Sequence, residues 1–156
     1  MLLGLSLAVF SCGDDEPDQP LGELTVDIDG QAFRSTAIEA TMVVSAGVGV
    51  KNLTIIATEE GEEITLILQQ LSADVTDACI PLADYSNANP QRTAGLDYTV
   101  DGNKQGVLET LEVNVTRCST SQNRIDGNFT AVIQTAGGEL SLTNGRFVNV
   151  LFQVQQ

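Results

Sequence analysis

Residues 53–68 read LTIIATEEGEEITLIL and decide the fold. Apolar side chains occupy every second position on both sides of the Glu60-Gly61 pair, and a period of two predicts β-strands rather than a helix. A pair that ends in glycine supplies the positive φ that a two-residue hairpin requires. The stretch therefore predicts an antiparallel hairpin with one face in a core and one face in water.

The same alternation recurs along the chain, and no stretch keeps a helical apolar period over three turns. Short turn pairs separate the runs, while Asp126-Gly127 fits a bulge inside a long strand better than a turn. In the last run, Val148, Val150, Phe152 and Val154 are expected on one face, opposite Phe147 and Leu151. We expect strands at 24–28, 38–44, 53–57, 64–68, 96–100, 111–115, 129–133 and 148–154, and turns at Asp29-Gly30, Asp101-Gly102, Gly137-Gly138 and Asn144-Gly145.

This pattern predicts an all-β fold, an antiparallel two-sheet sandwich or flattened barrel of about eight to ten strands. A lipocalin-like barrel with an apolar cavity is the alternative. The chain of 156 residues is long enough for one such domain.

The composition excludes several functions. The chain has 21 acidic and 7 basic residues, a formal net charge of −14, which argues against a nucleic-acid binder. It has no His, which removes Ser-His-Asp and Cys-His catalysis and imidazole metal sites. We therefore expect no enzymatic activity and no cofactor.

The first residues have the character of a signal peptide. The apolar or small run 1–10 covers about 15 Å as a helix, half of a bilayer core of about 30 Å. Val9-Phe10-Ser11-Cys12 resembles a bacterial lipobox, which implies that Cys12 is acylated and becomes the first residue after cleavage. A secretory signal with an incidental cysteine is the alternative. No Lys or Arg precedes the run, so we expect the translation start to lie upstream.

These features predict three segments: a lipoprotein signal peptide at 1–11, an acidic disordered tether at 12–22, and a single β-domain at 23–156. The acidic residues Asp14, Asp15 and Glu16 after Cys12 resemble the surface-export signal of some Gram-negative lipoproteins. That resemblance implies an outer-membrane lipoprotein that faces the cell surface. A solvated linker with no role in targeting is the alternative.

With Cys12 acylated, Cys79 and Cys118 remain, and two thiols in an exported chain most simply form a disulfide. They enclose a loop of about 40 residues, for which the chain-entropy estimate is about 4 kcal/mol. Cys79 lies in the irregular segment 72–93, so the bond would fix this loop to the strand that ends at Cys118. Free buried thiols are the alternative.

Three segments together resemble a family of small uncharacterised bacterial lipoproteins. Residues 26–33 (VDIDGQAF) resemble its opening hairpin, and residues 125–131 (IDGNFTA) and 142–147 (LTNGRF) resemble its ending. The resemblance implies a β-domain with Phe33, Phe129 and Phe147 in the core and glycines at turns or bulges. It implies no activity.

Oxygen-rich side chains offer only weak Ca²⁺ sites. Asp27 and Asp29 share the polar face of one strand, and a second group lies in the irregular loop. For Asp27 and Asp29 we expect a solvated strand face, and for the loop group an acidic surface loop. Ca²⁺ binding is the alternative for both. The loop group comprises Asp74, Asp77 and Asp84 with Asn87 and Asn89.

The sequence therefore predicts a non-enzymatic, lipid-anchored β-domain of the cell envelope, a binding or accessory module whose partner is an envelope protein or a small molecule. A binding module would use a concave site or the loop at 72–93. A structural or adhesive surface protein and a lipocalin-like small-molecule binder are the alternatives. Only Tyr85 and Tyr98 offer aromatic rings with polar tips, so a glycan site that relies on aromatic stacking is not expected.

Overall fold

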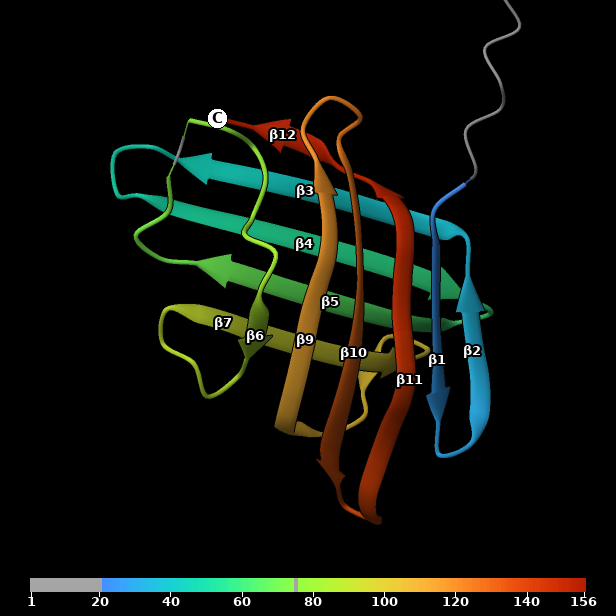
Figure 1. The fold of residues 1–156 in the computed structure, drawn as a ribbon. Helices are drawn as coiled ribbons and strands as arrows, with labels where there is room; N and C mark the ends of the chain where they lie inside the picture. Colours follow the sequence, from blue (N-terminus) through green and yellow to red (C-terminus); the bar gives the residue numbers. More distant parts are fainter. Residues whose placement is uncertain (1–20, 75) are drawn as a thin grey trace, which may run out of the picture.

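The computed structural model describes residues 21–74 and 76–156 and confirms the all-β fold (Figure 1). Within these ranges, no helix is long and apolar enough to cross a membrane. The strands are β1 (Glu23–Ile28), β2 (Gln31–Ser35), β3 (Ala37–Ser45), β4 (Val50–Glu59), β5 (Glu62–Gln70), β6 (Asp84–Ser86), β7 (Arg92–Val100), β8 (Asn103–Lys104), β9 (Val107–Ser119), β10 (Arg124–Thr135), β11 (Gly138–Leu151) and β12 (Gln153–Gln155).

All strands belong to one curled sheet in the order β12-β3-β4-β5-β7-β6-β9-β10-β11-β1-β2, with β8 on β7. Figure 1 shows two layers whose strands cross. We call β3, β4, β5 and β7 the hairpin layer, and β9, β10, β11, β1 and β2 the bulged layer. Short β6 links them, because it pairs in parallel with β7 and antiparallel with β9.

The chain also joins the two layers at the opposite side of the fold. β11 passes into β12 through the single residue Phe152, and β12 pairs in parallel with Thr41–Val43 of β3. The Phe152 N–H donates to the Asn123 carbonyl over 2.9 Å, and the Phe152 side chain is buried. Because of this crossing, the sheet has the form of a flattened barrel.

Side chains from both layers fill the space between them and form one apolar cluster. Alternation places them there: in β4 and β5, every second residue is buried. The expected core residues Phe33, Phe129 and Phe147 are all buried. Each large apolar side chain removed from water in this way contributes about 1.5–3 kcal/mol, which is the main driving force for the fold.

Three predicted turns are confirmed. Asp29-Gly30, Glu60-Gly61 and Asp101-Gly102 each carry positive φ at both residues and connect consecutive strands. Their φ values lie between 46° and 89°, as a two-residue hairpin requires. The turn predicted at Gly137-Gly138 is present but lies one residue earlier, at Ala136-Gly137, and Gly138 begins β11.

The predicted turn at Asn144-Gly145 is wrong. Both residues lie inside β11, where the register shifts between Phe129 and Ala131 of β10. Asn144 has a φ of 55°, the same conformation that a hairpin turn would need. A β-bulge uses that conformation too, so the residue pair does not distinguish a bulge from a turn.

The predicted bulge at Asp126-Gly127 is confirmed, because the β9–β10 register shifts between these residues. A second irregularity in β11 corrects the expected face of its last residues. Asn149 has a φ of 52°, and Val148 pairs with Glu23 on the outward face while its neighbour Phe147 is buried. The bulge at Asn149 reverses the alternation, so Val148 does not share the core face of Val150.

Candidate functional site

The irregular segment between β5 and β7, residues 71–91, is fixed to the bulged layer by a disulfide. Cys79 and Cys118 are bonded, as the sequence predicts, with their Cα atoms 5.7 Å apart. At the base of the segment, the Leu71 N–H donates to the Gln91 carbonyl over 2.9 Å. We call this segment the β5–β7 loop.

A buried lysine supports the loop from below. Lys51 of β4 is 3% exposed, and its Nζ donates to Asp77 Oδ1 over 2.9 Å and to the Cys79 carbonyl over 2.6 Å. The hydrogen bond from Lys51 lowers the pKa of Asp77 below its ordinary value. The Cys79 N–H also donates to Asp77 Oδ1, over 2.9 Å. One ion pair thus fixes the loop beside the disulfide.

Other polar residues of the loop shape its backbone. Asp74 accepts the N–H of Thr76 over 3.0 Å, and this bond lowers the pKa of Asp74. Asn89 Oδ1 accepts the N–H groups of Gln91 and Arg92 over 2.9 and 3.1 Å. These are the local side-chain turns that Asp and Asn commonly make.

Asn87 connects the same loop to β9. Its Nδ2 donates to the Glu109 carbonyl over 2.8 Å, and its Oδ1 accepts the Leu111 N–H over 3.1 Å. An asparagine amide that bonds a strand in both directions substitutes for a short piece of strand pairing. Asn87 therefore has a structural role that extends the contact between β6 and β9.

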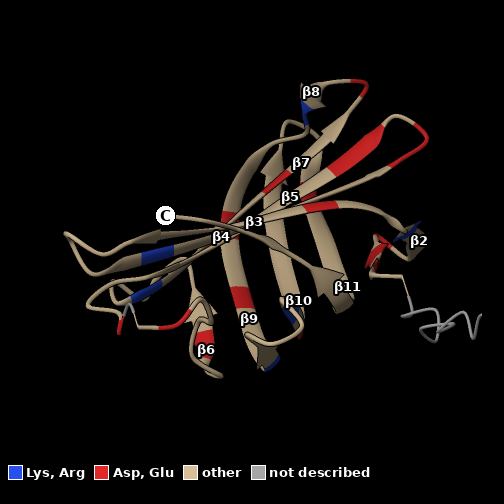
Figure 2. Cartoon of the chain, turned by 90° about the horizontal axis from the view of Figure 1, so that it is seen from above, with Lys and Arg blue, Asp and Glu red and all other residues tan. Residues whose placement is uncertain are grey.

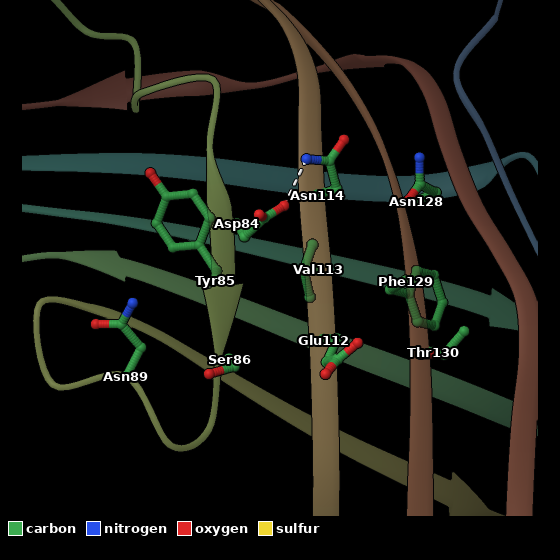
Figure 3. Close-up of a pocket in the computed structure, with 10 residues that line it drawn as sticks. All are labelled: Asp84, Tyr85, Ser86, Asn89, Glu112, Val113, Asn114, Asn128, Phe129 and Thr130. Atoms are coloured by element: carbon green, nitrogen blue, oxygen red, sulfur yellow. Dashed lines mark hydrogen bonds between the residues drawn. The ribbon is translucent and has the colours of Figure 1, made fainter.

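A cleft of about 480 Å³ lies where β6, β9 and β10 run side by side (Figure 3). Val113 and Phe129 are buried and form its floor, whereas their neighbours along each strand point outward. Its size is within the range of small-ligand sites. The lining residues are Asp84, Tyr85, Ser86, Asn89, Glu112, Val113, Asn114, Asn128, Phe129 and Thr130.

Strand register arranges the polar lining in two rows across the three strands. Asp84 of β6 pairs with Asn114 of β9, which pairs with Asn128 of β10. Two residues further along β6, Ser86 pairs with Glu112, which pairs with Thr130. Neighbouring strands lie about 4.8 Å apart, so each row presents polar groups at regular intervals over about 10 Å.

The hydrogen bonding of these rows leaves acceptors exposed. Asn114 Nδ2 donates to Asp84 Oδ1 over 2.7 Å, a bond that orients the amide (Figure 3). The Glu112 carboxylate has no hydrogen-bond or ion-pair partner in the described part of the chain, and it is exposed. The lining contains no Lys or Arg. The cleft is therefore suited to a ligand that donates hydrogen bonds and carries no negative charge.

Tyr85 supports β6 from inside. It is 1% exposed, and its hydroxyl donates to the Pro81 carbonyl over 3.2 Å. Burial raises the pKa of Tyr85 to about 12, so the ring stays neutral at physiological pH. Its ring is part of the core and offers no exposed stacking surface to a ligand.

The structure places the aspartates of the expected Ca²⁺ sites in three separate regions. Asp27 accepts from Asn144 Nδ2, and Asp29 accepts from the Ser141 N–H, both over 2.8 Å, so both tie the first hairpin to β11. Among the described residues, no three Asp, Glu or Cys side chains are grouped so that they could hold a metal ion. Asp74 and Asp77 border a cleft beneath the β5–β7 loop, and Asp84 lies in the cleft at β6.

Sequence reasoning missed most of the polar lining. Glu112, Asn114, Asn128 and Thr130 all occupy outward positions that alternation predicts, but alternation carries no signal about which strands become neighbours. Of the polar lining, the candidate Ca²⁺ group in the irregular loop contains Asp84 and Asn89. Cys12, the expected lipidation site, lies outside the described residues.

Comparison with known proteins identifies a family but no activity. No curated protein and no solved structure matches the chain. The model of one family, described as a domain of unknown function (DUF6252), matches residues 22–151. This match covers nearly all of the described β-domain, from the start of β1 to the end of β11. The chain therefore belongs to the family of the domain of unknown function DUF6252.

Proposed function

We propose that this protein is a non-enzymatic binding module, lipid-anchored at the outer face of the outer membrane, which holds a neutral, hydroxyl-rich ligand such as a saccharide in the cleft at β6, β9 and β10. The observation that carries the proposal is the pair of polar rows in this cleft. The rows are built on strands, and a disulfide and the ion pair of buried Lys51 with Asp77 fix the loop that provides one wall.

The donor and acceptor groups of the cleft favour this ligand class. Carboxylates such as Glu112 only accept hydrogen bonds, whereas the amides and hydroxyls of Asn128 and Thr130 can both donate and accept. A sugar hydroxyl both donates and accepts, so it can satisfy either kind of group. An anionic ligand would meet two carboxylates, Asp84 and Glu112, without a compensating cation in the lining.

Recognition would rest on hydrogen bonds alone, because both tyrosines are buried. Each hydrogen bond to a charged group contributes about 1.5–3 kcal/mol, and neutral bonds contribute less. Because association also costs translational and rotational freedom, a few such hydrogen bonds give only modest affinity. We therefore expect binding that depends strongly on the two or three best-placed side chains.

The cleft can be tested with a glycan array probed with the purified full-length protein, followed by titration calorimetry on the strongest glycan. Glu112→Gln should weaken binding about tenfold, equivalent to about 1.4 kcal/mol, because a neutral amide accepts a weaker hydrogen bond than a carboxylate does. Glu60→Gln makes the same change at an exposed turn outside the cleft and should leave the affinity unchanged. Equal affinity for both variants, or no binding to any glycan, would contradict the proposal.

The proposed anchor rests on the lipobox-like residues before Cys12. Labelled palmitate should be incorporated into the wild-type protein in its native host and not into Cys12→Ser. A second chain with Ser11→Ala, which keeps the cysteine, should still be labelled. Labelling of Cys12→Ser would contradict acylation at this cysteine.

The proposed surface location rests on the acidic residues after Cys12. Protease added to intact cells should digest the wild-type protein. Replacement of Asp14, Asp15 and Glu16 by Asn, Asn and Gln should protect it, because the acidic address is lost while acylation remains. If both chains are digested equally, the acidic segment is a linker and not an address.

A further inference from the structure

The edge of β3 is only partly occupied. β12 pairs with Thr41–Val43, whereas in the described ranges no strand pairs with residues 38–40 on the side away from β4 (Figure 1). An unpaired strand edge exposes N–H and C=O groups in the geometry of a sheet, and it is a template for another strand. Three residues of β3 therefore form an open edge directly beside β12.

A cleft of about 520 Å³ lies along this open edge. Its lining includes Ile38, Glu39 and Ala40 of β3 together with Leu21 and Leu151. Leu21 is 80% exposed and Leu151 is 56% exposed. The edge is thus bordered by a free space whose lining combines exposed leucines with polar side chains.

The charge around the edge is negative. Glu39 lines this cleft and also a second cleft of about 510 Å³ on the outer face of the same strands, where Glu63 lies. Neither lining contains Lys or Arg. In Figure 2, acidic residues (red) lie on β3 and at the β4–β5 turn of the same layer. A partner at this edge would meet the negative charge of Glu39, with Glu63 further along the same outer face.

We propose that the open edge of β3 binds an extended peptide of a partner protein by strand addition, and that this peptide alternates apolar with basic side chains. β12 shows that the same edge accepts a short strand next to the open residues. Main-chain hydrogen bonds give affinity in this mode, and alternate side chains give specificity. Apolar side chains would contact Leu21 and Leu151, and basic side chains would lie beside Glu39. This site is separate from the cleft at β6.

The probe is the peptide Val-Lys-Val-Lys-Val-Lys, titrated into the full-length protein in detergent micelles, with Val-Glu-Val-Glu-Val-Glu as the charge control. NMR should show slower exchange of those amides in residues 38–40 that point away from β4, on addition of the lysine peptide only. Glu39→Lys should weaken that peptide at least tenfold and strengthen the glutamate peptide. Glu112→Lys makes the same change in charge in the cleft at β6 and should leave the affinity for both peptides unchanged.

N-methylation of the peptide tests the backbone pairing without any change to the protein. Along a strand, N–H groups point alternately to opposite edges, so only alternate residues donate to β3. One peptide is N-methylated at every Val and the other at every Lys. The peptide whose methyl groups replace the N–H groups that face β3 should lose at least tenfold in affinity. The peptide whose methyl groups lie on the opposite edge should bind as tightly as the unmethylated peptide.

Three results would overturn the proposal. Equal affinity of both N-methylated peptides would show binding without strand pairing. Unchanged affinity for Glu39→Lys would remove the charge complementarity. A concentration-dependent dimer in analytical ultracentrifugation that Glu39→Lys alters and the lysine peptide does not dissociate would identify a second copy of this chain as the occupant.

Discussion

Both layers consist of strands with alternating apolar residues, but their strand registers are determined in different ways. In the hairpin layer, the pairs β3–β4, β4–β5 and β5–β7 run without any shift in register. In the bulged layer, the pairs β9–β10, β10–β11 and β1–β11 all contain shifts. The hairpin layer follows from local alternation and turn pairs, as does the β1–β2 hairpin. The pairing of β9, β10, β11 and β1 needs close contacts between residues far apart in the chain.

The space around one glycine in each layer illustrates this difference. A Cβ on Gly127 of the bulged layer would lie 2.3 Å from Phe147 Cζ and 2.6 Å from the Asn114 carbonyl oxygen. A Cβ on Gly95 of the hairpin layer would meet nothing closer than Ile67 Cβ at 4.0 Å. Four changes, ordered from the largest expected effect to the smallest, test this contrast and the linkage between the layers.

The first change removes the covalent link between the layers. The double variant Cys79→Ser, Cys118→Ser should lose about 4 kcal/mol of unfolding free energy, because the disulfide closes a loop of about 40 residues. Urea unfolding followed by circular dichroism measures it, with reductant added to the wild type as the second comparison. A loss below about 1 kcal/mol would mean that the β5–β7 loop is held mainly by noncovalent contacts.

The second change tests the close contact in the bulged layer. Gly127→Ala should lose about 2–3 kcal/mol, because the added methyl overlaps a buried ring and a backbone carbonyl. Adding Phe147→Leu removes the ring but not the carbonyl, so the double variant should lose less than the sum of the two single variants. Urea unfolding of the four chains gives this coupling, and simple additivity would contradict the proposed contact.

The third change tests the ion pair under the loop. Asp77→Asn should lose about 1 kcal/mol at pH 7, a modest amount because the Asp77 side chain is 56% exposed and water screens the pair. The pKa of Asp77 in the folded protein lies below its ordinary value because Lys51 donates to it, so the contribution is complete above about pH 5 and is lost as the pH falls through the folded pKa. Thermal unfolding should therefore show the two chains converging below about pH 4. A constant difference down to pH 2 would contradict the ion pair.

The fourth change is the control for the second. Gly95→Ala should raise the unfolding free energy by about 0.5 kcal/mol, since alanine loses less backbone entropy than glycine and meets no close atom here. The same urea titration measures it. A loss as large as that of Gly127→Ala would remove the contrast between the layers.

The sequence predicts the hairpin layer well because its information is local. Glu60-Gly61 and the alternation around it are sufficient to place β4 and β5. Asn144-Gly145 also ends in glycine and also has a positive φ at its first residue, yet it forms a bulge. What decides the outcome there is the position of Phe129 on a neighbouring strand, which no local pattern contains.

The cleft at β6 was predictable only in part, for the same reason. Alternation correctly turns Glu112 and Asn114 outward, and the proline-bearing loop that supplies Asp84 stands out by its composition. The cleft exists because β6 pairs with β9, whose paired residues Asp84 and Asn114 are 30 positions apart. A single sequence does not specify that pairing.

The crossing from β11 to β12 has a consequence for when the chain can fold. β1 pairs with β11, and β3 pairs with β12, so these early strands cannot pair until residues far later in the chain have been synthesised. The hydrogen bond from the Ser141 N–H to Asp29 already spans 112 positions. Such high contact order slows folding and leaves emerging segments without partners. A chain exported in the way proposed here would thus reach the far side of the membrane still unfolded, and its last strands would complete the barrel there.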